Sequence, residues 1–135
     1  MKKTEQQIKN LKDALVWWQT VPERNVDLAT WRDESTPPYT CNTICCFGGW
    51  CAVQPLLVAQ GVQVDDVDGS INIPSLSENG YSTVSNVALE LFGDKQMFYV
   101  RGKHRHDKRK GSDHAAVTHR IKMALKERDQ YTYSI

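Results

Sequence analysis

The sequence predicts a mainly α-helical, single compact domain over residues 1–135, with about four helices and a small β-hairpin. Three observations predict this class. Several amphipathic segments begin at residues that cap helices, one Asp-Gly pair separates two short alternating segments, and no internal repeat is present. A chain of 135 residues, 40% of them hydrophobic, is also the size expected of one domain with one core.

The first predicted helix begins near Thr4 and ends before Pro22. Its apolar residues recur every three or four positions and form one stripe: Ile8, Leu11, Leu15 and Trp18. Thr4 is the expected N-cap, with Gln7 at the capping-box position. Residues 21–40 contain three prolines and four acidic residues, and we expect an ordered loop anchored by Trp31.

A second helix is expected from Cys45 or Gly48 to about residue 60, with Gly61 as its C-cap. Pro55 interrupts this segment, so the helix either begins close to Pro55 or is kinked there. The alternating segments 62–67 and 70–73 flank Asp68-Gly69 and predict a hairpin.

Two further helices follow. Ser82 or Thr83 is expected to cap the third helix, which ends at Gly93, and Ser112 or Asp113 is expected to cap the last helix. Met97, Phe98 and Tyr99 continue the apolar character after Gly93. The residues predicted to lie in or near the core are Trp18, Trp31, Trp50, Leu57, Leu91, Phe92, Ile121 and Leu125.

All four cysteines, a Gly pair and a Trp lie within residues 41–51. Small cysteines packed where helices meet are the favoured interpretation, because free cysteine is among the most buried residue types. A zinc site with the histidines is disfavoured, since the cysteines and histidines are far apart in sequence. A nucleophilic cysteine at a helix N-terminus is the alternative that would make the protein an enzyme. Neither alternative gives a complete motif, so we assign no catalytic residue, metal or cofactor.

Charge is distributed unevenly along the chain. Residues 1–100 carry seven Lys/Arg against twelve Asp/Glu, whereas residues 101–135 carry ten against four. Residues 101–111 are therefore predicted to form a basic loop, which is either a nucleic-acid patch, a surface for an acidic protein, or a solvated mobile loop. The residues predicted to bind a partner or nucleic acid are Arg101, Lys103, His104, Arg105, His106, Lys108, Arg109, Lys110 and Arg120.

The order of these features resembles a group of small bacteriophage and bacterial proteins. That group is marked by a Trp, a Cys-Gly-Thr-x-x-Cys-x-x-Gly-Trp-Ala segment and a later Leu-Phe pair. Here three residues rather than two precede Gly49, Cys51 comes before Ala52, and Asn42 replaces the usual Gly. The resemblance implies a phage-type origin and a mainly helical fold, and no reaction. The residues of its structural motif that match in this chain are Trp31, Cys41, Thr43, Cys45, Gly49 and Trp50.

We therefore expect a non-enzymatic phage accessory protein, located in the host cytoplasm, that inhibits or redirects a host protein such as a defence or nucleic-acid-processing enzyme. The alternatives are a nucleic-acid-binding protein that uses residues 101–128 and a cysteine-dependent enzyme. No signal peptide or membrane span is expected, because the N-terminal segment lacks an apolar region and residues 35–64 are broken by Pro and Gly.

Overall fold

The computed structural model describes residues 1–28, 46–65, 69–108 and 110–133, and it confirms a mainly α-helical fold with one small hairpin. No helix among these residues has the length and apolarity needed to cross a membrane. The longer helices are α1 (Glu5–Trp17), α4 (Val84–Phe92) and α5 (Asp113–Lys126), and the short ones are α2 (Phe47–Cys51) and α3 (Pro55–Val58). The strands β1 (Gln63–Val64) and β2 (Ile71–Asn72) are antiparallel, and 3₁₀ turns lie at Trp18–Thr20, Glu23–Asn25 and Pro74–Leu76.

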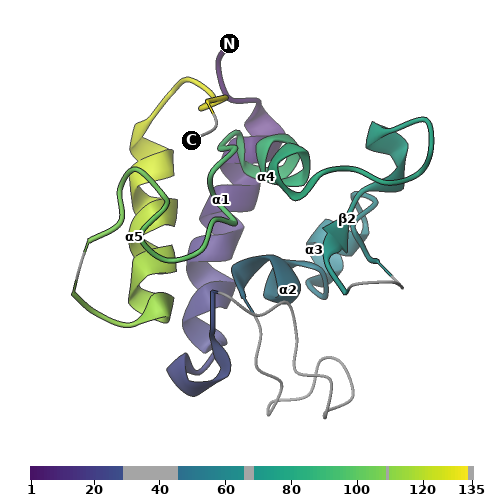
Figure 1. Cartoon of the computed structure of the whole chain (residues 1–135). Coiled ribbons are helices and arrows are strands. Elements are labelled where there is room, and N and C mark those ends of the chain that lie inside the picture. Colours follow the sequence, from purple (N-terminus) through teal and green to yellow (C-terminus); the bar gives the residue numbers. More distant parts are fainter. Residues whose placement is uncertain (29–45, 66–68, 109, 134–135) are drawn as a thin grey trace.

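Helix α1 is the centre of the fold, and it packs against both α5 and α4 (Figure 1). At its C-terminal end, Trp18 Nε1 donates to the carbonyl of His114 (3.0 Å), and His114 Nε2 donates to the carbonyl of Trp18 (2.8 Å). The two rings are stacked with centroids 4.7 Å apart. This reciprocal contact fixes the C-terminal end of α1 against the first turn of α5.

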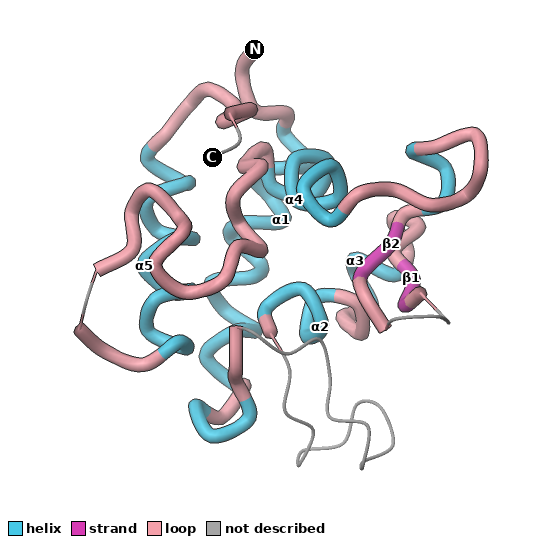
Figure 2. Tube along the Cα trace, in the orientation of Figure 1, coloured by secondary structure: helices cyan, strands magenta, loops and turns pink. Residues whose placement is uncertain are grey.

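The two ends of the chain meet beside the C-terminus of α4 (Figure 2). Lys3 N donates to the carbonyl of Arg128 and Gln130 N donates to that of Met1, both at 2.8 Å. Tyr131 N donates to the carbonyl of Gly93, also at 2.8 Å. The segment that follows α5 therefore binds the N-terminus and the end of α4 together.

The predicted second helix is two helices, which corrects that boundary. Pro55 is the first residue of α3, where its missing N–H costs no hydrogen bond, and α2 ends at Cys51. Gly61 ends α3 in a left-handed conformation (φ 97°), with Gly61 N bound to the carbonyl of Val58 and Val62 N bound to that of Leu57.

The cap expected at Thr4 is confirmed, since Thr4 and Gln7 form a reciprocal capping box. Gln7 also has a role that the sequence did not predict. Gln7 and Asn10 are buried, and their side-chain amides donate to the carbonyls of Leu89 and Leu91 at the end of α4. Gln7 also donates to the carbonyl of Glu90 (3.3 Å), and the carbonyls of Glu90 and Leu91 are acceptors of the kind that a helix leaves open at its C-terminus.

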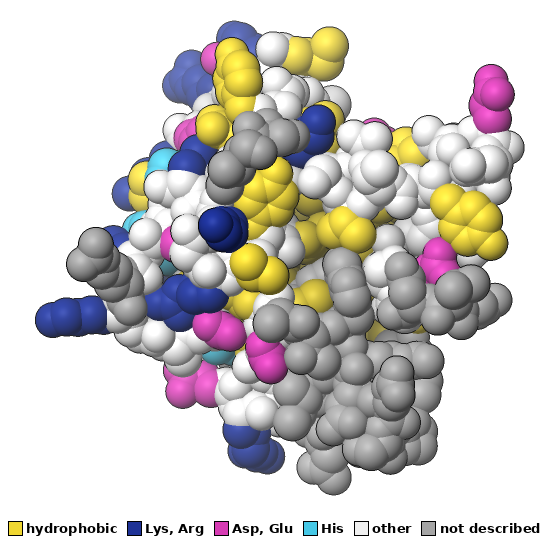
Figure 3. Space-filling view, in the orientation of Figure 1, with side chains coloured by type: hydrophobic (Ala, Val, Ile, Leu, Met, Phe, Trp, Pro, Cys, Tyr) yellow, Lys and Arg dark blue, Asp and Glu magenta, His cyan; other side chains and the backbone are white. Residues whose placement is uncertain are grey.

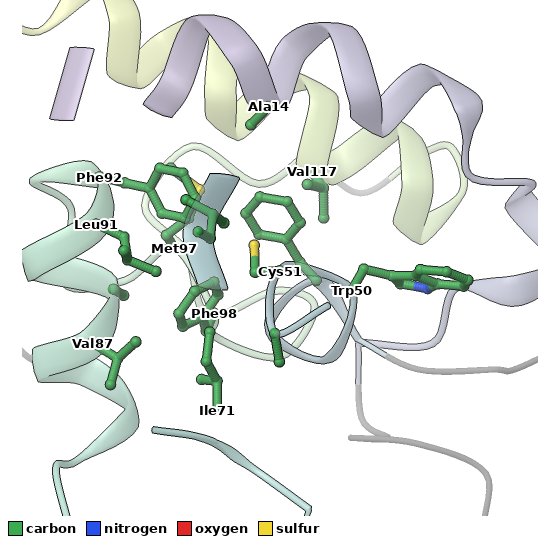
Figure 4. Packing of buried hydrophobic residues seen from close by; sticks show 14 of the residues in the cluster. Ala14, Trp50, Cys51, Ile71, Val87, Leu91, Phe92, Met97, Phe98 and Val117 are labelled. Carbon is green, nitrogen blue, oxygen red and sulfur yellow. The ribbon is translucent and has the colours of Figure 1, made fainter. Parts of the chain in front are cut away.

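The core lies between α1, α2, α4 and α5, and Figure 4 shows its apolar side chains converging there. Trp18, Phe47, Phe92 and Phe98 form its aromatic centre, in which Phe47 lies 5.0–5.7 Å from the other three ring centroids. The predicted core residues Trp18, Trp50, Leu57, Leu91, Phe92 and Ile121 are buried and Leu125 is partly buried, whereas Trp31 lies outside the described residues.

Gly93 is a position where a side chain is not tolerated. It adopts φ +66°, and a Cβ there would lie 2.9 Å from Lys3 Cγ and 3.0 Å from Gln7 Oε1. We expect Gly93→Ala to lower the free energy of unfolding by about 2–4 kcal/mol, the sum of a left-handed backbone cost and overpacking. Gly80→Ala is the matched control, because Gly80 has φ +80° with no atom within 4 Å of the added Cβ. Urea unfolding in which both variants lose equal stability would contradict this account.

Candidate functional site

Arg120 lies at the centre of the region in which the sequence predicted a binding surface. It projects from α5, is 0% exposed, and has all five of its N–H donors satisfied. Nε and Nη2 bind the two carboxylate oxygens of Asp107 at 2.8 and 2.6 Å. The remaining donors bind the carbonyls of Met97, Tyr99 and Val100 at 2.7–3.3 Å. Arg120 therefore holds segment 97–107 against α5.

A second set of buried charges surrounds Asp94, which follows Gly93, the C-cap of α4. The carboxylate of Asp94 is fully buried and accepts from His104 Nε2 (2.9 Å) and Arg105 Nη1 (2.9 Å). Burial acts to raise the pKa of Asp94, but the hydrogen bonds from His104 and Arg105 outweigh it and hold that pKa at about 2. Asp94 is therefore an anion paired with Arg105.

The hydrogen bonds of His104 define its protonation state. His104 Nδ1 accepts from the backbone N–H of His106 (3.1 Å), so the ring proton of the neutral form lies on Nε2, facing Asp94. Burial lowers the pKa of His104 against the opposing effect of Asp94, and the charges of Arg120 and Arg105 act in the same direction as burial. Protonation would also break the bond at Nδ1. His104 thus serves as a neutral bridge within the fold.

Arg105 links this cluster to the end of α5 and the C-terminal segment. Its Nη2 binds Glu127 (2.8 Å), which also accepts from His106 Nε2 (2.7 Å). The guanidinium lies 3.6 Å from the ring centroid of Tyr131. Lys3 Nζ donates to the carbonyls of Glu127 and Asp129, and burial lowers the pKa of Lys3. The N-terminal segment, residues 101–111 (the basic segment) and the C-terminal segment are thereby joined.

Arg101 closes the other end of the basic segment. Its Nη2 donates to the carbonyls of Lys108 (2.8 Å) and Lys110 (3.0 Å). Its Nη1 donates to the carbonyl of Gly111 (3.1 Å) and to Asp113 (3.2 Å) in the first turn of α5. One guanidinium thus binds Lys108, Lys110 and Gly111 together with the first turn of α5.

The residues predicted to bind a partner divide into two groups. Arg101, His104, Arg105, His106 and Arg120 are buried or half-buried and bind internal groups. In contrast, Lys103, Lys108 and Lys110 are exposed and form no ion pair within the described part of the chain, and Arg109 lies outside it. Of the predicted residues that the structure describes, the three lysines are therefore the cations available to a partner.

Lys103 helps to line an open apolar groove, which we call the Lys103 groove. It has a volume of about 470 Å³ and is lined by Val84, Ser85, Phe98, Tyr99, Val100 and Lys103. Figure 3 shows hydrophobic side chains at the surface, in the middle of the face of the molecule that it draws. Sequence reasoning did not predict this groove, although the apolar residues that follow Gly93 were a signal for it.

The structural motif of the resemblance is only partly described. Gly49 and Trp50 are buried in α2, and Trp50 Nε1 donates to the carbonyl of Asn25 (3.0 Å), whereas Trp31, Cys41, Thr43 and Cys45 lie outside the described residues. Cys46 caps α2 and accepts from Gly49 N.

Burial raises the pKa of Cys46 to about 11, which is opposite to what a nucleophilic thiol requires. Cys51 is also buried. Over the described ranges, no three His, Cys, Asp or Glu residues are placed to hold a metal ion.

Comparison of the chain with protein families, with known proteins and with solved structures finds no match.

The contribution of the Arg120–Asp107 ion pair to the free energy of unfolding can be measured by substitution. We expect Arg120→Met to lower the free energy of unfolding by about 3–5 kcal/mol, because it leaves the Asp107 carboxylate without its buried counterion. Arg128→Met, at an exposed position, should change it by less than about 0.5 kcal/mol. Adding Asp107→Leu to Arg120→Met should recover part of the loss in urea unfolding, and a further loss in that double variant would contradict the pairing.

The neutral state of buried His104 predicts that acid destabilises the fold. Its folded pKa lies below the unfolded value, so the unfolded chain binds the proton first, and stability falls as the pH drops below about 6.5. The slope contributed by one histidine is at most about 1.4 kcal/mol per pH unit. Asp94 does not contribute between pH 7 and 5, because its stabilisation is lost only as the pH falls toward about 2.

The measurement is urea unfolding of the wild type and of His104→Gln between pH 7.5 and 5. The variant should be less stable at pH 7.5 and less sensitive to pH. His119→Gln is the control at a half-buried ring, whose removal should change the pH dependence less. A pH slope that is the same in His104→Gln as in the wild type would show that His104 is not held neutral.

Proposed function

We propose that this chain is a non-enzymatic binding protein that holds a segment of another protein in the Lys103 groove. The observation that carries this proposal is the groove itself, an apolar hollow that opens to solvent beside one exposed, unpaired lysine. Part of its lining is anchored, since the carbonyls of Tyr99 and Val100 bind the buried Arg120. An anchored surface loses little conformational freedom when a partner binds.

The occupant that fits best is an acidic segment with apolar side chains. Val84, Phe98 and Val100 offer apolar area, and Val100 is 46% exposed. Tyr99 adds an aromatic ring with a polar end, a residue type enriched among those that dominate binding energy. Lys103 forms no ion pair among the described residues, so a carboxylate of the partner would find a free cation in the lining of the groove.

The internal bonds of three described histidines and the burial of Cys46 support a binding role over an enzymatic one. His104, His106 and His114 each bind groups within the fold, and burial keeps the Cys46 thiol protonated at neutral pH. These residues hold the fold together. With the resemblance to phage proteins, this favours a host protein as the partner, one that the chain inhibits or redirects in the host cytoplasm.

A pair of matched valine substitutions tests the groove. Val100→Glu places a carboxylate in the apolar lining and should weaken capture of a partner at least tenfold. Val16→Glu makes the same change at a 72% exposed position on α1 and should leave capture unchanged. The measurement is a native pull-down from nuclease-treated bacterial lysate, followed by titration of the protein that the wild type retains.

Charge reversal provides the second arm of this test. Lys103→Glu should weaken the same partner and make its binding less dependent on salt, whereas Lys12→Glu, at an exposed lysine of α1, should do neither. Equal retention of the partner by the wild type and by Val100→Glu would contradict the proposal. So would equal loss in Val100→Glu and Val16→Glu, because the effect would then not depend on the groove.

A further inference from the structure

A second surface lies on the other side of the basic segment, where it meets α5. A hollow of about 160 Å³ is lined by Arg101, Lys108, Lys110, Ala115, Ala116 and His119, and we call it the α5 hollow. A neighbouring hollow of about 340 Å³ shares Arg101 and Lys108 with it. Neither hollow includes a residue of the Lys103 groove.

The lysines of the α5 hollow extend from fixed backbone. Arg101 binds the carbonyls of both Lys108 and Lys110, so the two side chains start from positions that one guanidinium holds in place. Both side chains are exposed and form no ion pair within the described ranges. Two cations are therefore held close together with no internal counterion of their own.

Helix α5 extends this positive surface. Ala115 and His119 line the hollow, and Lys122 and Lys126 follow at spacings of three and four residues, so the four positions share one face of the helix. That face is about 16 Å long from residue 115 to residue 126. Figure 3 shows Lys, Arg and His side chains gathered at the edge of the molecule where Figure 1 places α5.

The nearby carboxylates are occupied by other partners. Asp107 is bound by Arg120, Asp113 by Arg101, and Glu127 by Arg105 and His106. The sequence has no acidic residue between Asp113 and Glu127. Burial and then the charge of Lys108 lower the pKa of His119, which agrees with a positive potential in the hollow.

We propose that the α5 hollow and the lysines along α5 bind the phosphate backbone of a nucleic-acid duplex. Lysines lie at both ends of this 16 Å face, Lys108 and Lys110 in the hollow beside Ala115 and Lys122 and Lys126 farther along α5. That arrangement matches a linear polyanion with one phosphate per ~3.4 Å of each strand better than it matches a single small anion. Among the described residues, no Phe, Tyr or Trp lines either hollow, and His119 is the one ring there, so unpaired bases would find little surface on which to stack. Contact is with the backbone, and binding is therefore independent of sequence.

The test is fluorescence anisotropy of a labelled 20-base-pair DNA duplex with the full chain, at pH 7.5 and 50–200 mM NaCl. If Lys108, Lys110, Lys122 and Lys126 each neutralise one phosphate, the logarithm of affinity should fall with that of salt at a slope near −3.6. Lys108→Gln/Lys110→Gln should reduce the slope by about 1.8 and the affinity at 0.1 M salt by roughly 10- to 100-fold.

The control is Lys2→Gln/Lys12→Gln, which removes the same charge at two exposed lysines outside the α5 hollow and should change affinity less than about threefold. Circular dichroism of each variant verifies that it is folded. Equal losses in the two double variants would overturn the proposal, because the effect would then be one of net charge. So would a salt slope near zero, or a single strand that binds more tightly than the duplex.

Inorganic tripolyphosphate distinguishes the other source of the same chemistry. The duplex proposal is overturned if the wild type binds tripolyphosphate but no duplex, and Lys108→Gln/Lys110→Gln no longer binds tripolyphosphate. The hollow would then be a site for a small phosphorylated ligand. The Val100→Glu variant should bind the duplex as the wild type does, so this proposal and the one for the Lys103 groove fail independently.

Discussion

Arg120 is a buried cation whose guanidinium binds one carboxylate and three backbone carbonyls, all from segment 97–107. A charge in this position is tolerated only if every donor is satisfied, so the segment must follow one path around it. That path forms one wall of the Lys103 groove. It also brings Arg101 to the first turn of α5, where the α5 hollow forms. Both candidate surfaces therefore depend on one buried side chain.

The internal ion pairs also reduce the positive charge that the C-terminal part of the sequence offers to a partner. Residues 101–135 carry six more Lys/Arg than Asp/Glu, yet most of the arginines near the basic segment bind Asp94, Asp107, Asp113 or Glu127. The lysines are the cations that point outward. Arginine, with its planar fork of donors, suits buried pairs and carbonyl clusters, whereas lysine is strongly hydrated and stays in water. The division between scaffold and surface thus follows from the chemistry of the two side chains.

Local patterns in the sequence were sufficient to predict α1, α4, α5 and the hairpin, because their caps and periodicities lie within one element. The role of Arg120 was missed, although a signal existed: it shares a helical face with the buried residues Ala116, Val117, Ile121 and Ala124. Gln7 and Asn10 gave no such signal, since the α4 carbonyls they bind lie some 80 residues away in sequence. Asp94 likewise meets His104 and Arg105 through a turn that no local pattern specifies. The Lys103 groove is formed by residues 84–85 and 98–103, which the tertiary fold brings together. The apolar residues after Gly93 therefore indicated an apolar segment but not a groove.

Native-state hydrogen exchange in the basic segment tests the central claim most directly, namely that this segment is a fixed, internally bonded part of the fold. The amide of Gly102 donates to Asp107 (2.8 Å), that of Arg105 to Gln96 (3.0 Å), and that of His106 to His104 (3.1 Å). We predict that these three amides exchange far more slowly than in an unstructured peptide, with protection that disappears when Arg120 is replaced by Met. Exchange at unprotected rates in the wild type, while the amides of α5 remain protected, would contradict the account and show that the segment is a free loop.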